Sequence, residues 1–247
     1  MRELTDLRIL LIQARSTADI ELQEQECFLE RCRIDPRQLR AVNVLRDDIR
    51  PELLRGFDAL MIGGAGEFSA TEDYPWMGPV LDLVRYAYEI DFPTFGSCWG
   101  HQLIARALGG RIIHDSELAE LGCHPVSLTD AGRDDPLFGN FPDRFLANMG
   151  HHDRVEMLPP DAVELAVSDT QPHQAFRMDG RRMYGTQFHS ELDAFRERQR
   201  LYAYRDHYPE IAADESFQAV LNNLADTSAV DNLLHDFLVK CVLDHAS

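Results

Sequence analysis

One cysteine of the chain lies in a setting that suits nucleophilic chemistry. Residues 95–102 read FGSCWGHQ, with glycines two positions before and two after Cys98, between a predicted strand and a predicted helix. So sharp a turn holds its side chain at the carboxyl edge of a sheet, and glycines are needed where Cβ atoms would collide as strand and helix converge. The helix N-terminus favours the thiolate, and the Trp99 N–H would point towards a substrate carbonyl. Alone, the pattern fits an ordinary buried cysteine equally well.

A second segment offers a base for that thiol. Residues 185–191 read GTQFHSE and end another predicted strand. Residues i and i+2 of an extended segment share one side. We therefore expect Glu191 to hold one imidazole nitrogen of His189 and to leave the other free to take the Cys98 proton. By itself a His-x-Glu pair is more often a pair of exposed residues without a catalytic role.

A glycine cluster offers a place for developing negative charge. Residues 62–66 read IGGAG directly after a predicted strand, and such a cluster can be simply a turn. It can also present a bare N–H, here expected from Gly64, as a second oxyanion donor beside that of Trp99. Three strand ends then supply a nucleophile, a base with its orienting acid, and an oxyanion hole, and sites in open α/β sheets form at strand carboxyl ends.

The elements that must position these groups alternate in the first half of the chain. Helical spacing of apolar residues predicts helices at 19–33 and 79–90, and apolar runs predict strands at 7–12, 41–45, 59–62 and 92–95. This alternation predicts an α/β fold with a doubly wound, mostly parallel sheet flanked by helices. Further short strands, some extending the main sheet and others forming a small antiparallel layer, are expected at 111–114, 123–129, 144–149, 162–168, 174–178 and 182–188.

The C-terminal part of the chain has a different pattern. Residues 192–247 contain no glycine and one proline, and their apolar residues recur at helical spacing. We expect a main domain over 1–191 and a helical extension over 192–247 that packs on the same domain. A length of 247 residues fits one α/β domain or at most two small ones.

Composition excludes several classes of function. Acidic residues outnumber basic ones 42 to 24, for a net charge of −18, which disfavours binding to nucleic acid or to an anionic membrane. No apolar run approaches the roughly 18–20 residues that span a bilayer, and the first residues predict no secretory signal. The only lysine is Lys240, so neither a phosphate-binding Gly-Lys-Ser/Thr loop nor a Schiff-base lysine is available. Five scattered cysteines suit a reducing, cytoplasmic location.

Taken together, these segments resemble the class I (triad) glutamine amidotransferases, and specifically a stand-alone, GMP-synthetase-like glutaminase domain. GSCWGHQ is similar to the family's G-x-C-x-G-x-Q, and GTQFHSE to its x-Q-F-H-P-E. Residues 149–155, MGHHDRV, resemble the S-H-x-D-x-V stretch that borders the glutamine site in the GMP-synthetase-like branch. The resemblance runs from Leu7 to Glu191 in the expected order and implies the family's flavodoxin-like fold.

The resemblance also implies a reaction and the residues that perform it. A cysteine thiolate attacks the γ-carboxamide of glutamine, ammonia departs, and water hydrolyses the γ-glutamyl thioester to glutamate. No cofactor and no metal is implied. The implied roles fall to Cys98 as nucleophile, His189 as base and Glu191 as its orienting acid, to Gly64 and Trp99 as oxyanion donors, and to Gln102, Gly150 and His151 beside the bound glutamine.

Three positions depart from the family pattern. Ser190 replaces the usual proline between histidine and glutamate, which should loosen that turn modestly. Gly150 stands where a serine is common, so a hydroxyl contact to the substrate is expected to be missing. Trp99 is bulkier than the residue usual at its position and is expected to narrow the pocket.

Several alternatives stay open at this level. The substrate is glutamine or another γ-glutamyl small molecule, as in γ-glutamyl peptidases, and the ammonia acceptor is a separate synthetase subunit or absent. A non-catalytic, binding member of the fold is a further alternative. A metal site at His151, His152 and Asp153 is disfavoured because neighbouring strand residues point to opposite faces. A homodimer is an open hypothesis, with a candidate interface formed by Tyr202, Tyr204, Tyr208 and Phe217.

Overall fold

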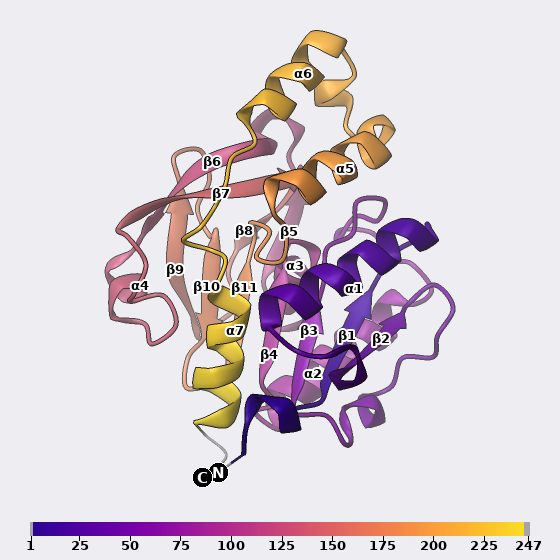
Figure 1. Ribbon diagram of the computed structural model, residues 1–247, viewed down its shortest axis with the longest axis vertical. Helices are drawn as coiled ribbons and strands as arrows, with labels where there is room; N and C mark the ends of the chain where they lie inside the picture. Colours follow the sequence, from indigo (N-terminus) through magenta and orange to yellow (C-terminus); the bar gives the residue numbers. More distant parts are fainter. Residues whose placement is uncertain (1, 245–247) are drawn as a thin grey trace.

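The computed structural model describes residues 2–244, apart from the side chain of Glu210, and its centre is a mixed nine-stranded sheet (Figure 1). The strand order is β2-β1-β3-β4-β11-β10-β9-β6-β7, and a separate antiparallel pair is formed by β5 and β8. The strands are β1 (Ile9–Gln13), β2 (Leu39–Asn43), β3 (Ala59–Ile62), β4 (Thr94–Ser97), β5 (Arg111–His114), β6 (Glu120–Leu128), β7 (Arg144–His151), β8 (Asp153–Met157), β9 (Ala162–Ser168), β10 (Ala175–Met178) and β11 (Met183–Thr186).

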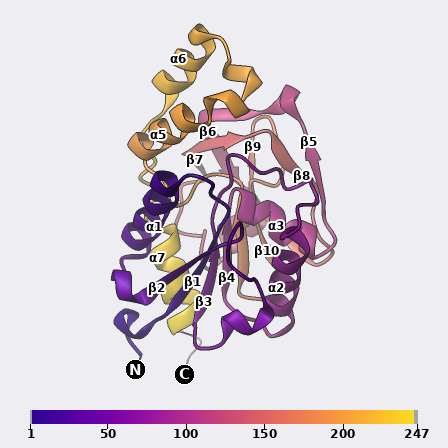
Figure 2. The same cartoon turned by 90° about the vertical axis from the view of Figure 1, so that its right-hand side faces the viewer.

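Helices cover both faces of the parallel half of the sheet (Figure 2). Alternate residues of β1 separate the two cores: Leu11 packs with α1 and α7 on one face, whereas Leu10 and Ile12 pack with α2 and α3 on the other. Because β1 is buried on both faces, its sequence is apolar almost throughout. The longer helices are α1 (Ala18–Cys32), α2 (Met77–Glu89), α3 (Trp99–Ala107), α5 (Ala194–Tyr204) and α6 (Asp214–Asn223), and the shorter ones α4 (Asp130–Asp134) and α7 (Leu233–Phe237).

The predicted fold class is confirmed. Strands β2, β1, β3 and β4 pair in parallel, as the alternation of strands and helices predicts, and β11, from the later part of the chain, also pairs in parallel with β4. The further strands expected after residue 110 divide as predicted: β10, β9, β6 and β7 extend the main sheet in antiparallel pairs, and β5 joins β8 in a small separate antiparallel layer. Two predictions were wrong in detail. Strand β8 was not expected, and the strand predicted at 182–188 ends at Thr186.

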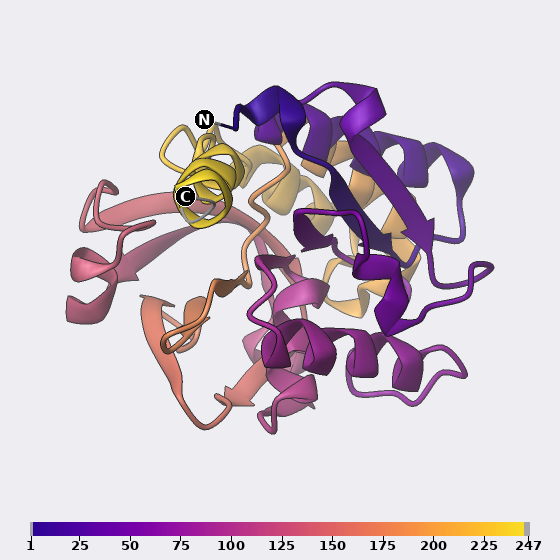
Figure 3. The same ribbon diagram turned by 90° about the horizontal axis from the view of Figure 1, so that it is seen from below.

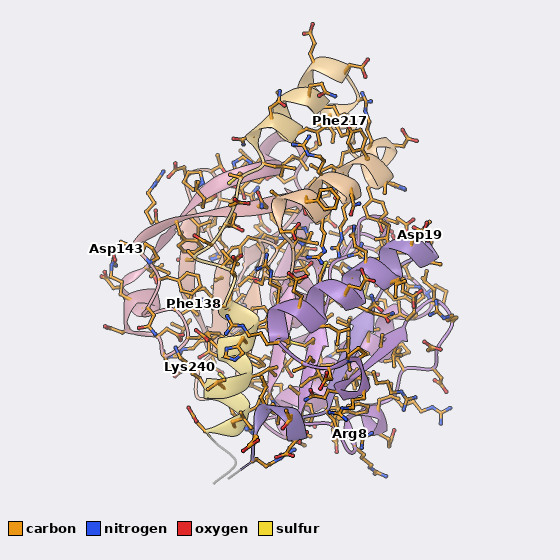
Figure 4. All side chains as sticks on the ribbon, viewed as in Figure 1. Arg8, Asp19, Phe138, Asp143, Phe217 and Lys240 are labelled. Atoms are coloured by element: carbon orange, nitrogen blue, oxygen red, sulfur yellow. The ribbon has the colours of Figure 1, made fainter. Side chains whose placement is uncertain are left out.

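The chain after residue 191 is helical and returns to the rest of the molecule at two places. Helices α5 and α6 form an apolar cluster with residues 208–211, with Ile20 of α1 and with Leu121 of β6, and Phe217, labelled in Figure 4, is buried in it. Helix α7 continues as a π-helical turn, Leu238–Leu243, and its Phe237 packs on Phe95 of β4 with ring centroids 5.4 Å apart. Figure 3 shows α7 end-on, close to the first described residues of the chain.

Lys240, the only lysine, lies on that terminal turn and donates to the carbonyl of Pro136 (Figure 4). Between residues 2 and 244, no helix has both the length and the apolar character that crossing a bilayer requires.

The crossing of β4, β3 and α3 leaves no room for side chains at two glycines. A Cβ placed on Gly96 would lie 2.4 Å from the carbonyl carbon of Gly100, and one on Gly100 would lie 2.4 Å from the carbonyl oxygen of Ile62. Both contacts are with backbone, which cannot rotate away. The expectation that glycines permit strand and helix to converge beside Cys98 is therefore confirmed.

This close approach yields a stability prediction. Gly100→Ala should lower the free energy of unfolding by about 3 kcal/mol or more, because the backbone of β3 or the start of α3 must shift. Gly78→Ala is the matched control: Gly78 lies on α2, a Cβ there meets nothing within 4 Å, and helical alanine is favoured over glycine. Denaturant unfolding should show the control unchanged or stabilised by about 1 kcal/mol. Equal effects of the two substitutions would contradict this account.

Candidate active site

Cys98 occupies a strained turn between β4 and α3. Its backbone angles are φ 52° and ψ −102°, in the left-handed region that residues with a Cβ rarely adopt. The turn is fixed from both sides, because the Cys98 N–H donates to the carbonyl of Thr186 and the Gly100 N–H donates to that of Gly63. Strain of this kind is typical of a nucleophile held above a sheet edge.

His189 and Glu191 lie beside Cys98, although not on a strand. Strand β11 ends at Thr186, and the two residues come from the irregular segment that follows it. The His189 N–H donates to the carbonyl of Asn148, which fixes the segment against β7. The imidazole Nδ1 lies 3.0 Å from Glu191 Oε1, and the side chains of His189 and Cys98 line the same small cavity. The three predicted residues therefore lie together, but a loop rather than strand alternation aligns the histidine with the acid.

The far oxygen of Glu191 is held by the residue before the cysteine. Ser97 Oγ donates to Glu191 Oε2 at 2.5 Å, and Arg200 Nη1 of α5 donates to Glu191 Oε1 at 3.2 Å. Burial by itself would raise the pKa of Glu191, but His189, Arg200 and Ser97 hold that pKa well below its usual range. Glu191 is therefore a carboxylate throughout the neutral pH range.

A buried ionic cluster surrounds the histidine. Arg15, after β1, lies 2.6 Å from Glu24 of α1, and Arg200 lies 3.7 Å from the same carboxylate. Glu197 of α5 places Oε2 3.9 Å from His189 Nε2, on the side opposite Glu191. Three carboxylates thus meet two guanidinium groups and one imidazole in a site shielded from water.

This cluster acts on the protonation of His189. Burial disfavours the charged imidazole, but Glu197, Glu191 and Cys98, in that order of strength, raise the pKa of His189 well above its usual value. The imidazolium is therefore favoured, and it completes the charge balance of the three carboxylates and two arginines.

The two predicted oxyanion donors differ in their surroundings. The Trp99 N–H lies in the first turn of α3, where amides have no partner within the helix. Gly64 lies close to the triad, since a Cβ added to it would be 3.3 Å from His189 Cε1 and 3.8 Å from Cys98 Cβ. Its N–H, however, donates to Glu24 Oε1 at 3.2 Å. Donation to an oxyanion would require this amide to leave Glu24.

A large cavity of about 510 Å³ opens at Cys98 and contains the predicted substrate-binding residues. Gln102 is held there by the carbonyl of Asp153 at 2.7 Å and by Gln187 Oε1 at 3.1 Å. His151 Nδ1 bonds to the Asp153 carbonyl, and its Nε2 lies 3.2 Å from Glu120. The walls come from residues 65–69 after β3, from Cys98, Trp99 and Gln102, from residues 150–153, and from His207 and Tyr208.

The side chains around position 150 explain why a glycine fits there. A Cβ there would lie 3.0 Å from Glu197 Oε1 and 3.9 Å from both His189 Nε2 and the Tyr208 hydroxyl oxygen. The hydroxyl of Tyr208 also donates to the Gly150 carbonyl at 3.0 Å. A serine side chain would therefore make a tight contact with the Glu197 carboxylate, which would have to shift by a few tenths of an ångström.

Local contacts accommodate the other two departures from the family pattern, Ser190 and Trp99. The Ser190 hydroxyl lies 2.8 Å from that of Thr186, so this hydrogen bond replaces part of the rigidity that a proline would give. The Trp99 ring joins the core under α2 and packs edge-on against Trp76, with centroids 5.7 Å apart. Much of the bulk of Trp99 therefore lies in the core, although the residue also lines the large cavity.

Sequence reasoning missed the residues that reach the site from outside the family motifs. Glu197, Arg200 and Tyr204 of α5 recur three and four residues apart, so they share one helix face. A helix face in the tail that carries these polar and aromatic residues was the feature of the sequence that could have indicated a contribution to the site. Gln187, whose amide nitrogen lies 3.8 Å from Cys98 Sγ, is part of a quoted motif but was given no role.

One group of side chains could hold a metal ion. His114, His152 and Asp153 each offer a ligand atom, all within 4.8 Å of one another, at the rim of the large cavity. Asp153 is already engaged, since one carboxylate oxygen accepts from Ser69 Oγ and the Ala70 N–H and the other pairs with His114. His151 is not part of this group, so the set differs from the one considered in the sequence.

Comparison with known proteins identifies the family. The sequence profile of the family described as "Glutamine amidotransferase class-I" matches residues 36–204, more than half of the chain. The chain belongs to the class I glutamine amidotransferase family, as its motifs predict.

Its relatives include GMP synthases, and a solved glutamine amidotransferase shares its fold. The glutamine-hydrolysing GMP synthase of Tolumonas auensis is 31% identical over 170 residues, which cover 63% of this chain and 30% of that protein's length. One subunit of the glutamine-hydrolysing GMP synthase of Archaeoglobus fulgidus is 32% identical over 145 residues, covering 57% of this chain and 70% of that relative. A crystal structure of a glutamine amidotransferase from Thermotoga maritima shares the fold, with a TM-score of 0.74 at 22% identity over 96% of this chain and 98% of that one.

The ionic cluster yields a second prediction. Glu24→Ala should lower the free energy of unfolding by about 3–5 kcal/mol, because it leaves Arg15 and Arg200 buried without their shared carboxylate. Glu26→Ala, an exposed position on the same helix, should change it by about 0.5 kcal/mol or less. Denaturant unfolding of both variants near neutral pH measures the difference. A small effect at Glu24 would mean that the cluster is not held together by this carboxylate.

Proposed function

We propose that this protein hydrolyses the γ-carboxamide of glutamine, releasing glutamate and ammonia. The observation that carries the proposal is the meeting of Cys98, His189 and Glu191 at one strained turn, in a chain that belongs to the class I glutamine amidotransferase family. The family supplies the reaction class, and the buried imidazole between a thiol and a carboxylate supplies the groups that it needs.

In the proposed acylation step, the Cys98 thiolate attacks the γ-carbon of glutamine. A C–S bond forms, and the carbonyl electron pair moves to oxygen. When the tetrahedral intermediate collapses, the C–N bond breaks and the His189 imidazolium gives its proton to the departing nitrogen, which leaves as ammonia. Glu191 keeps the imidazole oriented through Nδ1, so that Nε2 faces the reaction.

Deacylation uses the same groups in reverse. His189, now neutral, takes a proton from water while the oxygen of that water attacks the γ-glutamyl thioester. Glutamate forms, and the thiolate is released beside the imidazolium. The raised pKa of His189 favours its imidazolium form between turnovers.

The oxyanion is stabilised by backbone amides in this proposal. The Trp99 N–H at the start of α3 is the first donor, aided by the helix N-terminus. Gly64 becomes the second donor when its N–H exchanges Glu24 for the oxyanion. One donor of this type contributes roughly 10²–10³ in rate. Release of the Gly64 N–H from Glu24 would therefore raise the rate of the reaction strongly.

Glutamine binding is assigned to the large cavity. Gln102 is fixed by two hydrogen bonds beside Cys98, and the Gly150–His151 segment borders the same space. We assign the α-amino and α-carboxylate groups to this segment. Because Gly150 has no hydroxyl, the grip relies on backbone groups and on neighbouring side chains.

Two further proposals concern assembly. We propose that the ammonia passes to a separate synthetase subunit, since the Archaeoglobus relative is named as one subunit of a GMP synthase.

We also propose that residues 1–191 and 192–247 act as one domain, because α5 supplies Arg200 and Glu197 to the site and α7 packs on β4.

The proposed function is tested at the nucleophile. Cys98→Ala should reduce glutamine hydrolysis by at least about 10⁴-fold, because it removes the only group that forms the thioester. Ammonia and glutamate release measure turnover, and mass spectrometry after treatment with a glutamine-mimicking electrophile measures covalent labelling.

Cys123→Ala is the matched control, a buried cysteine on β6 that lines neither cavity at Cys98. It should retain both activity and labelling. Undiminished labelling or turnover of the Cys98 variant would exclude Cys98 as the nucleophile.

A further inference from the structure

Two of the three side chains that could hold a metal ion are brought together by the pairing of β5 with β8. His114 on β5 and Asp153 on β8 are direct partners in the register of this antiparallel pair, and His114 Nδ1 lies 2.9 Å from Asp153 Oδ1. Side chains at opposed positions of such a pair lie on the same face and close together. The strand register therefore fixes the imidazole beside the carboxylate.

His152 joins this pair because the chain bends at that residue. It lies between the end of β7 and the start of β8 and belongs to neither strand. Its carbonyl accepts from the Asp115 N–H, which ties the bend to the end of β5. Its ring packs against those of Tyr208 and His114, with centroid separations of 5.3 and 4.6 Å. The expectation that neighbouring residues point to opposite faces holds within a strand and therefore fails at His152.

The spacing of the three side chains is close to that of a metal site. Their ligand atoms all lie within 4.8 Å of one another. Around a tetrahedral Zn²⁺ ion, with bonds of about 2.0–2.2 Å, the ligand atoms lie roughly 3.3 Å apart. The widest pair must therefore approach by roughly 1.5 Å or less, which changes of side-chain rotamer can supply. The side chain of His114, which is 55% exposed, is the least constrained of the three.

The Asp153 carboxylate is held in the way that a metal ligand needs. Its Oδ2 accepts from Ser69 Oγ at 2.5 Å and from the Ala70 N–H at 3.0 Å. Carboxylates that bind metal ions are typically fixed by hydrogen bonds of this kind. One oxygen of Asp153 is therefore engaged by the protein, and Oδ1, which faces His114, is the oxygen that can bind an ion.

The charges around the large cavity also favour a cation. Glu67 and Glu72 line this cavity together with Asp153, whereas its described lining residues include no lysine and no arginine. A concave wall with carboxylates and without fixed cations attracts a divalent ion. Two imidazole nitrogens and one carboxylate oxygen form a ligand set that suits Zn²⁺ and similar ions, and three protein ligands leave a position for a further one.

We propose that His114, His152 and Asp153 bind a divalent transition-metal ion of the zinc type, with one coordination position open to the large cavity. All three side chains line this cavity, so the side of the ion that they leave uncovered is directed into it. Water or the oxygen of a carboxylate ligand can occupy that position. The inference goes beyond the proposed function and does not depend on it, because none of the three ligands belongs to the triad.

Binding is tested with Co²⁺, which takes the same ligand sets as Zn²⁺ and absorbs visible light strongly when it has four ligands. The protein is prepared without a polyhistidine tag and with Cys98→Ala, so that the nucleophile cannot bind the ion. It should take up one Co²⁺ per chain with the visible spectrum of a four-coordinate site, and Zn²⁺ should displace this ion.

Two variants test the ligands separately. His114→Ala and His152→Ala, each in the Cys98→Ala background, should weaken Co²⁺ binding by about 100-fold or more, because each removes one of three ligands. His235→Ala is the matched control, since that imidazole also lies beside a carboxylate, 3.3 Å from Asp236, but is part of no three-ligand group in the described structure. It should bind Co²⁺ as the background protein does. Visible absorption and titration calorimetry measure the affinity.

The open coordination position is tested with two small probes. Acetate, added to the Co²⁺-loaded protein, should change the visible spectrum because its carboxylate replaces water on the ion. Acetamide has the same shape without the charge and should leave the spectrum unchanged. No response to acetate would overturn the assignment of an open position.

Two other results would overturn the site itself. Absence of Co²⁺ binding by the background protein would leave His114 and Asp153 as an ordinary ion pair. Binding that survives both His114→Ala and His152→Ala would place the ion elsewhere on the chain. Because none of these measurements uses turnover, their outcome is separate from that of the glutaminase test at Cys98.

Discussion

The requirement that buried charges balance is the constraint on which this site depends. Glu24, Glu191 and Glu197 are all buried, and Arg15 and Arg200 supply two positive charges among them. An uncompensated charge in such a place costs several kcal/mol. The imidazolium form of His189 supplies a third positive charge for these three carboxylates, and Glu197 and Glu191 accordingly raise the pKa of His189.

The balance also joins elements that are remote in the chain. Arg15 follows β1, Glu24 belongs to α1 and Arg200 to α5, while Glu191 follows β11. Each guanidinium bridges segments that the parallel sheet brings to one edge, where the strand carboxyl ends converge. Helix α5 is thus a part of the site rather than an appendage to it. Helix α5 lines the space beside His189 and supplies two of the charges there, those of Glu197 and Arg200.

The sequence predicted those parts of the site that local patterns determine. Apolar runs predicted the parallel strands, and the glycines around Cys98 predicted a turn too crowded for Cβ atoms, which the contacts at Gly96 and Gly100 confirm. Pairings between remote residues could not be predicted. The bond from the Gly64 amide to Glu24 spans 40 positions, and no pattern near either residue indicates it. The same holds for Arg200 and Glu24, whose contact depends on how α5 packs against α1.

Gly150 shows how a local departure from a family pattern can have a remote cause. Read alone, a glycine in place of serine suggests a lost substrate contact. In the fold, a side chain at position 150 would press against Glu197, whose Oε1 would lie 3.0 Å from the Cβ. A serine hydroxyl is neutral and could only donate or accept a hydrogen bond, whereas a carboxylate also attracts the imidazolium across 3.9 Å. The glycine at position 150 and the carboxylate beside His189 therefore belong to one arrangement and must be explained together.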